Sequence, residues 1–206
     1  NYYGVAIMLR FLTAGESHGR CLTVILEGIP AGLVIIEENI NYELSRRQRG
    51  YGRGERMKIE KDTARILSGV RWGKTTGAPI TLQINNRDGE NWQKIMSGLA
   101  ENVDKSKIIT KPRPGQGDLA GLLKFQLDDI RNVLERASAR ETAARVAAGA
   151  VCKQFLNCFN IRVASYVTQI GKIKTPAAGA AEVKFNKIQG IADKSPVRCL
   201  DKSAER

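Results

Sequence analysis

The sequence predicts an α+β fold, and two observations carry this prediction. Short apolar, β-branched runs broken by glycine and proline fill residues 9–36 and recur within residues 66–85, which is typical of antiparallel strands joined by turns. Helical spacing of apolar residues is confined to two other segments, residues 37–47 and 138–155. Strands that are segregated from helices indicate α+β architecture rather than alternating βα units.

The length and charge of the chain are those of a globular protein that binds anions. The chain has 206 residues, 42% of them hydrophobic, and 33 basic against 21 acidic side chains give a formal net charge of +12. A chain of this size can bury roughly 70% of its unfolded surface without disulfides. The longest unbroken apolar stretch, Val146–Cys152, is far shorter than the ~18 residues of a membrane span, and no signal peptide is visible. The excess of positive charge predicts a phosphorylated or polyanionic partner.

Cysteine and histidine usage argues against metal chemistry. The four cysteines form no C-x-x-C pair, and His18 is the only histidine, so a Cys/His zinc set cannot be completed. The cysteines are expected to be reduced thiols in a cytosolic protein; they are Cys21, Cys152, Cys158 and Cys199.

The first strands and the first helix follow from local patterns. Residues 1–7 show no targeting pattern and are treated as an upstream extension. We expect an opening meander of three strands, Leu9–Ala14, Cys21–Ile29 and Gly32–Ile36. Acids in the first turn and arginines in the last predict a helix over Glu37–Arg47.

Later segments alternate between loop and regular structure. Ile66–Val70 and Ala78–Asn85 are expected strands, whereas polar residues 87–106 and the proline- and glycine-rich residues 111–121 are expected surface loops. Ser138 and Glu141 match a capping box that precedes a helix reaching Phe155. Residues 161–170 are expected to form a strand, and the remainder to be rich in loops.

The densest charge lies in residues 45–61, where seven basic side chains face two acidic ones. Arginines grip phosphate or carboxylate through paired hydrogen bonds, and the glycines at 50, 52 and 54 let a backbone approach a ligand, which predicts a phosphate clamp. A nucleic-acid strip with Tyr51 stacking on a base, or a solvated basic loop, explains the same pattern. The basic residues are Arg46, Arg47, Arg49, Arg53, Arg56, Lys58 and Lys61.

Three other places could carry chemistry. His18 stands between glycines directly after a strand, where it could donate a proton or merely occupy a turn. The helix start at residues 136–142 carries Arg136 and Arg140, which suits an anion site or a simple helix cap. Arg113 in the proline-glycine loop is a further candidate cation, unless solvent alone surrounds it.

Taken together, five segments resemble the chorismate synthase family in order and spacing. The resemblance extends from about Met8 to the end of the chain. It rests on FLTAGESHGRCL, RRQRGYGRGERMKIEKD, ILSGVRWGKTTGAPI, KPRPGQGDLAG and DIRNVLERASARETAARVAAGA.

The resemblance implies a carbon–oxygen lyase of aromatic amino acid biosynthesis. Its substrate would be 5-enolpyruvylshikimate 3-phosphate, which loses phosphate in an anti-1,4 elimination to give chorismate at the last common step of the shikimate pathway. Reduced FMN would be required, with NADPH as a candidate reductant. The implied fold is a sandwich of antiparallel sheets and helices, and the implied setting is a cytoplasmic homotetramer, or a plastid if a transit peptide belongs to the protein.

Site residues follow from the same resemblance. His18 matches the histidine that protonates the leaving phosphate. Arg47 and Arg53 match arginines that bind substrate or nicotinamide nucleotide, and Arg113 joins them as a candidate. The flavin would lie against Arg136, Ala137, Ser138 and Gln116.

Two departures from the family pattern bear on activity. Gln116 stands where the family's P-G-H-A-D loop has a histidine, and glutamine cannot exchange a proton near neutral pH. The chain also stops where family members continue, so residues 8–206 are expected to be the N-terminal portion of a single domain. The alternative from another class is a non-catalytic protein that binds anions or nucleic acid through the basic strip; the resemblance weighs against nucleic acid.

Overall fold

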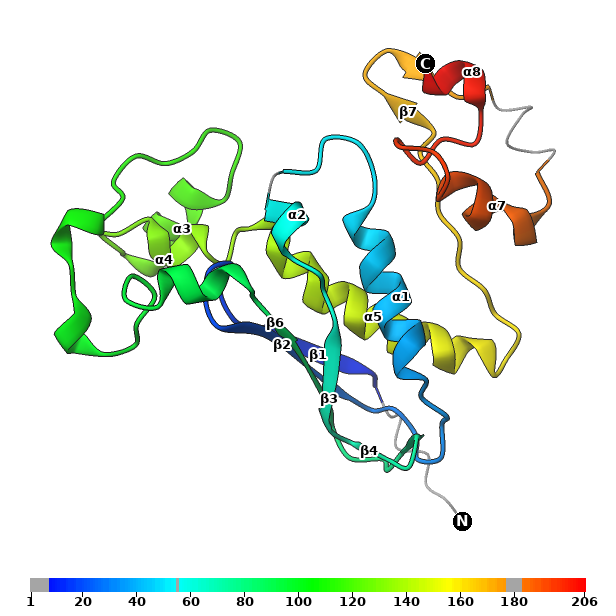
Figure 1. Cartoon of the computed structure of the whole chain (residues 1–206), viewed down its shortest axis with the longest axis horizontal. Coiled ribbons are helices and arrows are strands. Elements are labelled where there is room, and N and C mark those ends of the chain that lie inside the picture. Colours follow the sequence, from blue (N-terminus) through cyan, green and yellow to red (C-terminus); the bar gives the residue numbers. More distant parts are fainter. Residues whose placement is uncertain (1–7, 55, 177–182) are drawn as a thin grey trace.

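The computed structural model describes residues 8–54, 56–176 and 183–206 (Figure 1). The extension expected at residues 1–7 lies outside the described residues, as does Glu55 of the basic strip. None of the described helices is long and apolar enough to cross a membrane. Within the same described ranges, no group of three or more His, Cys, Asp or Glu side chains could hold a metal ion.

A four-stranded antiparallel sheet forms the centre of the molecule. Its strands are β1 (Arg10–Ala14), β2 (Cys21–Glu27), β6 (Ile80–Asn85) and β3 (Ala64–Ser68), in the spatial order β1-β2-β6-β3. Side chains alternate between the two faces, so every second residue of β2 and β6 is buried. The buried set is Leu22, Val24, Leu26, Ile80, Leu82 and Ile84.

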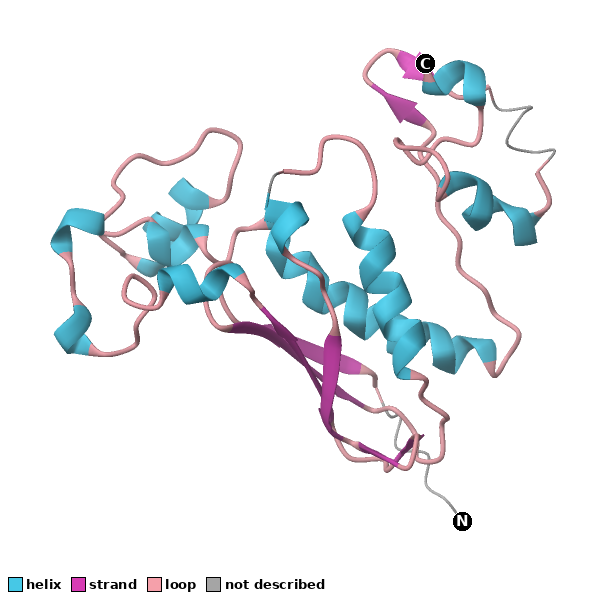
Figure 2. Ribbon diagram, viewed as in Figure 1, coloured by secondary structure: helices cyan, strands magenta, loops and turns pink. Residues whose placement is uncertain are grey.

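Two helices cover one face of this sheet (Figure 2). Helix α5 (Thr142–Asn157) packs on β2 and β6, and α1 (Glu37–Gln48) packs on α5 and β3. Ile40 and Leu44 of α1 are fully buried. The inward face of α5 is mostly alanine, and small side chains let a helix approach a sheet closely. The predicted α+β fold and the predicted first helix are confirmed.

The third strand of the expected meander is wrong. Residues 32–36 make one isolated bridge, between Val34 and Lys74, and form no strand. The reason lies in Thr75, whose hydroxyl donates to the Pro30 carbonyl (2.6 Å) and accepts the Leu33 amide (2.9 Å). This fastens the segment to the short hairpin of β4 (Val70–Arg71) and β5 (Lys74–Thr75) instead of to the sheet.

The capping box at the start of α5 is formed only in part. The Ser138 hydroxyl accepts the Arg140 amide at 3.2 Å and caps a 3-10 turn, η4 (Ala139–Glu141). Glu141 does not reach back to Ser138, because its carboxylate accepts from Thr13 and Arg145. The α-helix therefore begins at Thr142, three residues later than the box predicts.

A small lobe of short elements follows β6. It contains the 3-10 turns η1 (Asp88–Trp92), η2 (Ala100–Asn102) and η3 (Lys105–Lys107), and the helices α3 (Asp118–Phe125) and α4 (Arg131–Leu134). The expected surface excursion at 87–106 is confirmed as short turns. The expected loop at 111–121 ends early, because residues 118–121 already belong to α3.

The C-terminal residues form a second small lobe (Figure 1). Residues 161–168 contain no strand, so the expected strand at 161–170 is wrong; only β7 (Gln169–Ile170) pairs with β8 (Ile173–Lys174). Helices α7 (Phe185–Ala192) and α8 (Lys202–Glu205) were expected to be loop. Asp193 bonds to Arg46 of α1 and so ties this lobe to the central layer. A short helix, α2 (Arg56–Ile59), lies within the basic strip of residues 45–61.

Candidate functional site

The loop between β1 and β2 presents His18 at the end of the sheet. Gly15 begins this loop with φ +97°, and a Cβ there would stand 2.2 Å from the Cys21 carbonyl oxygen, so only glycine fits. The tight turn places Ser17 and His18 against α4 rather than in solvent. Ser17 is buried, and the His18 side chain is 21% exposed.

Glu135, at the end of α4, holds the His18 imidazole. Its Oε1 lies 2.9 Å from Nδ1 of the ring, and its Oε2 accepts the backbone N–H of His18 at 2.7 Å. The Trp92 ring lies against the imidazole with 4.2 Å between centroids. Asp88 is the nearest acid on the other side, with Oδ2 4.0 Å from Nε2. The ring is thus fixed while Nε2 stays free of any hydrogen bond within the described residues.

Arg56 approaches the same loop from α2. Its guanidinium donates to the Ser17 hydroxyl at 2.8 Å and to the Ser17 carbonyl. The Ser17 hydroxyl also lies 2.9 Å from that of Ser138. Nε of Arg56 is buried without a hydrogen-bond partner in the part of the chain that the structure describes, 3.7 Å from Asp88. A buried N–H donor without an acceptor is costly, so this atom is poised to meet an anion.

Two buried acids stand behind the arginines. Asp62 accepts from Arg140 and, at 3.2 Å, from Arg47. Glu60 accepts from Arg56 at 3.1 Å and lies 3.7 Å from Arg140. These carboxylates neutralise part of the positive charge and fix the direction of each guanidinium. Together the paired arginines, the serines and His18 form one continuous cluster.

The Arg47 guanidinium is fully used in hydrogen bonds within the protein, so it is not free to bind a ligand. Besides Asp62, it donates to the Thr142 hydroxyl (2.9 Å) and the Ala139 carbonyl (2.8 Å). Its side chain is only 10% exposed, and this burial lowers the pKa of the guanidinium. Arg47 therefore lies behind the cluster and ties α1 to the start of α5.

Arg53 and Arg113 form no hydrogen bond or ion pair with this cluster among the described residues. Arg53 is exposed on the loop after α1, where its Nε donates to the Arg49 carbonyl at 3.1 Å. Arg113 clamps Asp118, with Nε 2.8 Å and Nη2 2.9 Å from the two carboxylate oxygens. That bonding lowers the pKa of Asp118 to about 2. Arg113 thereby fixes the start of α3.

The segment expected to hold the flavin borders the cluster. Arg136 donates to the Gly15 carbonyl and to the Thr13 hydroxyl (3.2 Å), so its guanidinium is used to hold the His18 loop. A Cβ on Gly117 would lie 3.6 Å from that of Ala137. The loop carrying the exposed Gln116 therefore lies beside Ala137.

The basic strip does not form one continuous surface. Arg46, Arg47 and Arg56 point inward and bond to carboxylates. Its outward side consists of Arg49, Arg53, Lys61 and Tyr51, the last 85% exposed. A nucleic-acid strip needs its cations on one face, so this split favours the clamp over the strip and over a wholly solvated loop.

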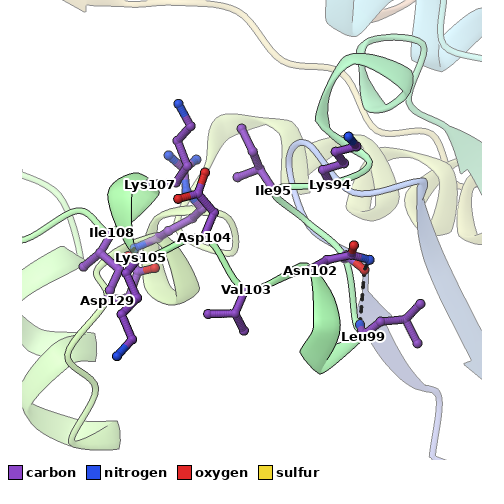
Figure 3. A pocket seen from close by; sticks show the side chains of 12 residues that line it. Lys94, Ile95, Leu99, Asn102, Val103, Asp104, Lys105, Lys107, Ile108 and Asp129 are labelled. Carbon is purple, nitrogen blue, oxygen red and sulfur yellow. Dashed lines mark hydrogen bonds between the residues drawn. The ribbon is translucent and has the colours of Figure 1, made fainter.

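Two cavities lie next to the cluster, but the cluster's arginines Arg56 and Arg140 do not line either of them. The one that borders His18 has a volume of about 610 Å³ and contains a single arginine, Arg20, in its lining. The other, of about 340 Å³, lies in the lobe after β6 (Figure 3). The Lys94 and Lys107 ammonium groups stand on opposite sides of the view in Figure 3 and do not converge. Neither cavity contains the Arg56 and Arg140 guanidiniums.

Several residues of the cluster carry no signal in the sequence. Glu135 is 117 positions from His18, and neither spacing nor composition links the two. Asp88 and Trp92 fall in the polar stretch expected to be surface. Arg56 and Arg140 were visible only as members of basic segments, and the buried acids Glu60 and Asp62 only as opposing charge.

Comparison with known proteins gives a consistent result. The family model described as chorismate synthase matches residues 9–206. The chain is 57% identical to a chorismate synthase of Carboxydothermus hydrogenoformans over 199 residues, which is 96% of this chain and 50% of the relative. It is 65% identical to a chorismate synthase of Aquifex aeolicus over 164 residues, 80% of this chain and 41% of that one.

A solved structure agrees with the sequence comparison. A crystal structure of chorismate synthase superposes with a TM-score of 0.72 at 46% sequence identity, covering 96% of this chain and 50% of that one. The chain thus spans about half the length of the relatives it matches.

Proposed function

The chain belongs to the chorismate synthase family, and on that premise we propose that the His18 cluster is the phosphate-eliminating site of such an enzyme. The substrate is 5-enolpyruvylshikimate 3-phosphate and the product chorismate. Because the chain spans about half the length of its relatives, the activity is proposed from the site and not carried over from them.

One observation supports this proposal above the others. The only histidine of the chain stands beside Arg56, whose buried Nε lacks an acceptor among the described residues. A phosphate dianion with two carboxylates requires converging cations and a proton donor. Arg56 supplies a cation and His18 a proton donor within one cluster. The buried Arg140 guanidinium, bonded to Asn86, Asp62 and the Asn85 carbonyl, adds positive charge behind them.

The chemistry of these residues follows from their placement. In the elimination, the C–O bond to phosphate breaks with its electron pair leaving on the phosphate. A ring carbon loses a proton to solvent water as its C–H electron pair forms the new double bond. The doubly protonated imidazole of His18 donates its Nε2 proton to the departing phosphate oxygen and keeps the Nδ1–H that faces Glu135. Arg56 holds the phosphate charge, and the hydroxyls of Ser17 and Ser138 orient its oxygens.

The residues present fit one side of a reduced flavin. Ala137 and Ser138 lie beside the loop of Gln116, and these three would contact the ring, whereas Arg136 is already bonded to the His18 loop. When bound, reduced FMN supplies redox chemistry to a reaction whose substrate and product are at the same oxidation level. Gln116 can donate a hydrogen bond there but cannot exchange a proton.

Other partners belong to the same proposal. Arg53 is exposed and suits the phosphate of a nicotinamide nucleotide such as NADPH. Family membership also supports a homotetramer in the cytoplasm.

The test is release of phosphate from 5-enolpyruvylshikimate 3-phosphate by this chain with pre-reduced FMN. We expect measurable release by the wild type, and a rate ~10²–10⁴ lower in His18→Ala with substrate affinity little changed, the usual contribution of a positioned acid. Equal rates in the two proteins would remove His18 from the chemistry. No release by the wild type would contradict the proposed activity.

A further inference from the structure

Glu135 bonds to the His18 loop through both its side chain and its backbone carbonyl. Its carboxylate accepts from the His18 backbone N–H (2.7 Å) and lies 2.9 Å from the ring Nδ1. Its own carbonyl accepts the Ser17 amide at 3.0 Å. The Glu135 side chain is 1% exposed, so water cannot replace these bonds.

The chemistry of a carboxylate decides which ring nitrogen carries the proton. An ionised carboxylate only accepts hydrogen bonds, so the imidazole must offer Nδ1–H to Glu135. Nε2 is then the nitrogen that exchanges a proton with anything that enters the site. Its nearest acid is Asp88 at 4.0 Å, which is too far for a hydrogen bond.

Glu135 is itself held by surrounding groups. Arg131, one turn earlier, lies 3.5 Å from Oε1. The Arg131 guanidinium also stands over the Trp92 ring, 5.3 Å from its centroid, and Trp92 in turn lies against His18. Glu135 and Trp92 thus contact the imidazole directly and restrict its rotation, and Arg131 contacts both of them.

We propose that Glu135 is a positioning residue that keeps His18 protonated at Nδ1 and directs Nε2 toward the ligand. Its consequence for turnover rests on the proposed function, whereas the tautomer itself does not. The arrangement is that of a carboxylate that orients a histidine so that the opposite nitrogen carries out the proton transfer.

The substitution Glu135→Gln gives a directional test. The His18 backbone N–H requires an acceptor, so the amide oxygen of the glutamine takes that place. The NH₂ group then faces Nδ1 and donates to it, which forces the proton to Nε2. The variant is nearly isosteric and is expected to reverse the tautomer without moving the ring.

Because the chain has one histidine, ¹⁵N-histidine labelling yields a single ring spectrum. At alkaline pH, where the ring is neutral, we expect Nδ1 of the wild type to carry the proton, and Nε2 to carry it in Glu135→Gln. The matched control is Glu43→Gln, whose carboxylate pairs with Lys153 at 2.5 Å and does not contact His18; its spectrum should match the wild type.

The outcomes separate the inference from the proposed function. A wild type with the proton at Nε2, or a Glu135→Gln variant whose tautomer is unchanged, overturns the inference; the wild-type measurement decides it even if the variant does not fold. In Glu135→Gln the amide donates to Nδ1 and so opposes the doubly protonated ring that gives up its Nε2 proton. Phosphate release should therefore fall by up to ~10⁴-fold while substrate affinity stays within about twofold. A reversed tautomer in a chain whose wild type releases no phosphate supports the inference and contradicts the proposed function.

Discussion

At the scale of single residues, the cluster is built from arginines whose roles differ by their partners. Arg56 has a buried Nε without an acceptor among the described residues, whereas Arg47 is bonded through every branch of its guanidinium. Arg53 extends from a surface loop. The three arginines carry equal charge in the sequence, but in the structure one has an unused buried N–H, one is structural and one is exposed.

This difference predicts that substitutions at Arg47 and Arg53 change the stability by very different amounts. Arg47→Ala removes a partner of the buried Asp62 and should lower the free energy of unfolding by about 2–4 kcal/mol, less than a wholly unpaired charge because Arg140 remains. Arg53→Ala should change it by less than about 0.5 kcal/mol. Urea unfolding of both variants measures this, and equal stabilities would show that Arg47 is a free clamp after all.

At the scale of elements, the loop between β1 and β2 and the helix α5 contain glycines with contrasting environments. A Cβ on Gly15 would overlap the Cys21 carbonyl, while a Cβ on Gly149 would meet nothing within 4 Å outside its own helix backbone. The first glycine shapes the turn that presents His18. The second only weakens a helix.

We therefore expect Gly15→Ala to destabilise the protein by about 3 kcal/mol or more, from positive φ and the clash together. Gly149→Ala should stabilise it by about 0.5–1 kcal/mol, through better helix propensity. Thermal unfolding of the pair gives the comparison. If Gly15→Ala left the melting temperature unchanged, the turn would not have the positive φ and the close Cys21 contact on which this prediction rests.

The start of α3 depends on pH through Asp118. The Arg113 guanidinium lowers the pKa of this buried carboxylate to about 2, below its value of about 3.9 in an unfolded chain. A lowered folded-state pKa contributes stability that is complete above about pH 5 and is lost as pH falls toward 2. The contribution is at most about 2 kcal/mol, reduced by solvent because Arg113 is 42% exposed.

Asp118→Asn should remove this dependence. Its unfolding free energy should match the wild type near pH 2 and fall below it near pH 6, which acid titrations of both proteins by circular dichroism can follow. A constant difference between the two proteins over that range would show that the ion pair does not form.

Prediction from sequence succeeded where one segment decides its own structure. The acids and arginines at the two ends of α1 specify that helix locally. It failed where a distant partner decides: Thr75 removes residues 32–36 from the sheet, and Thr13 and Arg145 draw Glu141 away from Ser138. The site divides in the same way, since His18 stands out in the sequence while Glu135 becomes visible only in three dimensions.

At the scale of the whole molecule, a sheet covered by two helices carries the cluster at one end. Its outward face leaves apolar residues in solvent, including Leu12 (69% exposed) and Leu67 (56% exposed). The chain spans about half the length of its relatives, and a flavin would meet one side of its site here.

The most direct measurement is isothermal titration of 5-enolpyruvylshikimate 3-phosphate into the wild type, Arg56→Gln and Arg49→Gln. Arg49 is exposed in the same basic strip and serves as the matched control. Charge-assisted hydrogen bonds contribute ~1.5–3 kcal/mol each, so Arg56→Gln should bind at least roughly tenfold more weakly while Arg49→Gln binds like the wild type. Equal losses in both variants, or tighter binding of single-stranded RNA with a steep salt dependence, would contradict a phosphate site at the His18 cluster.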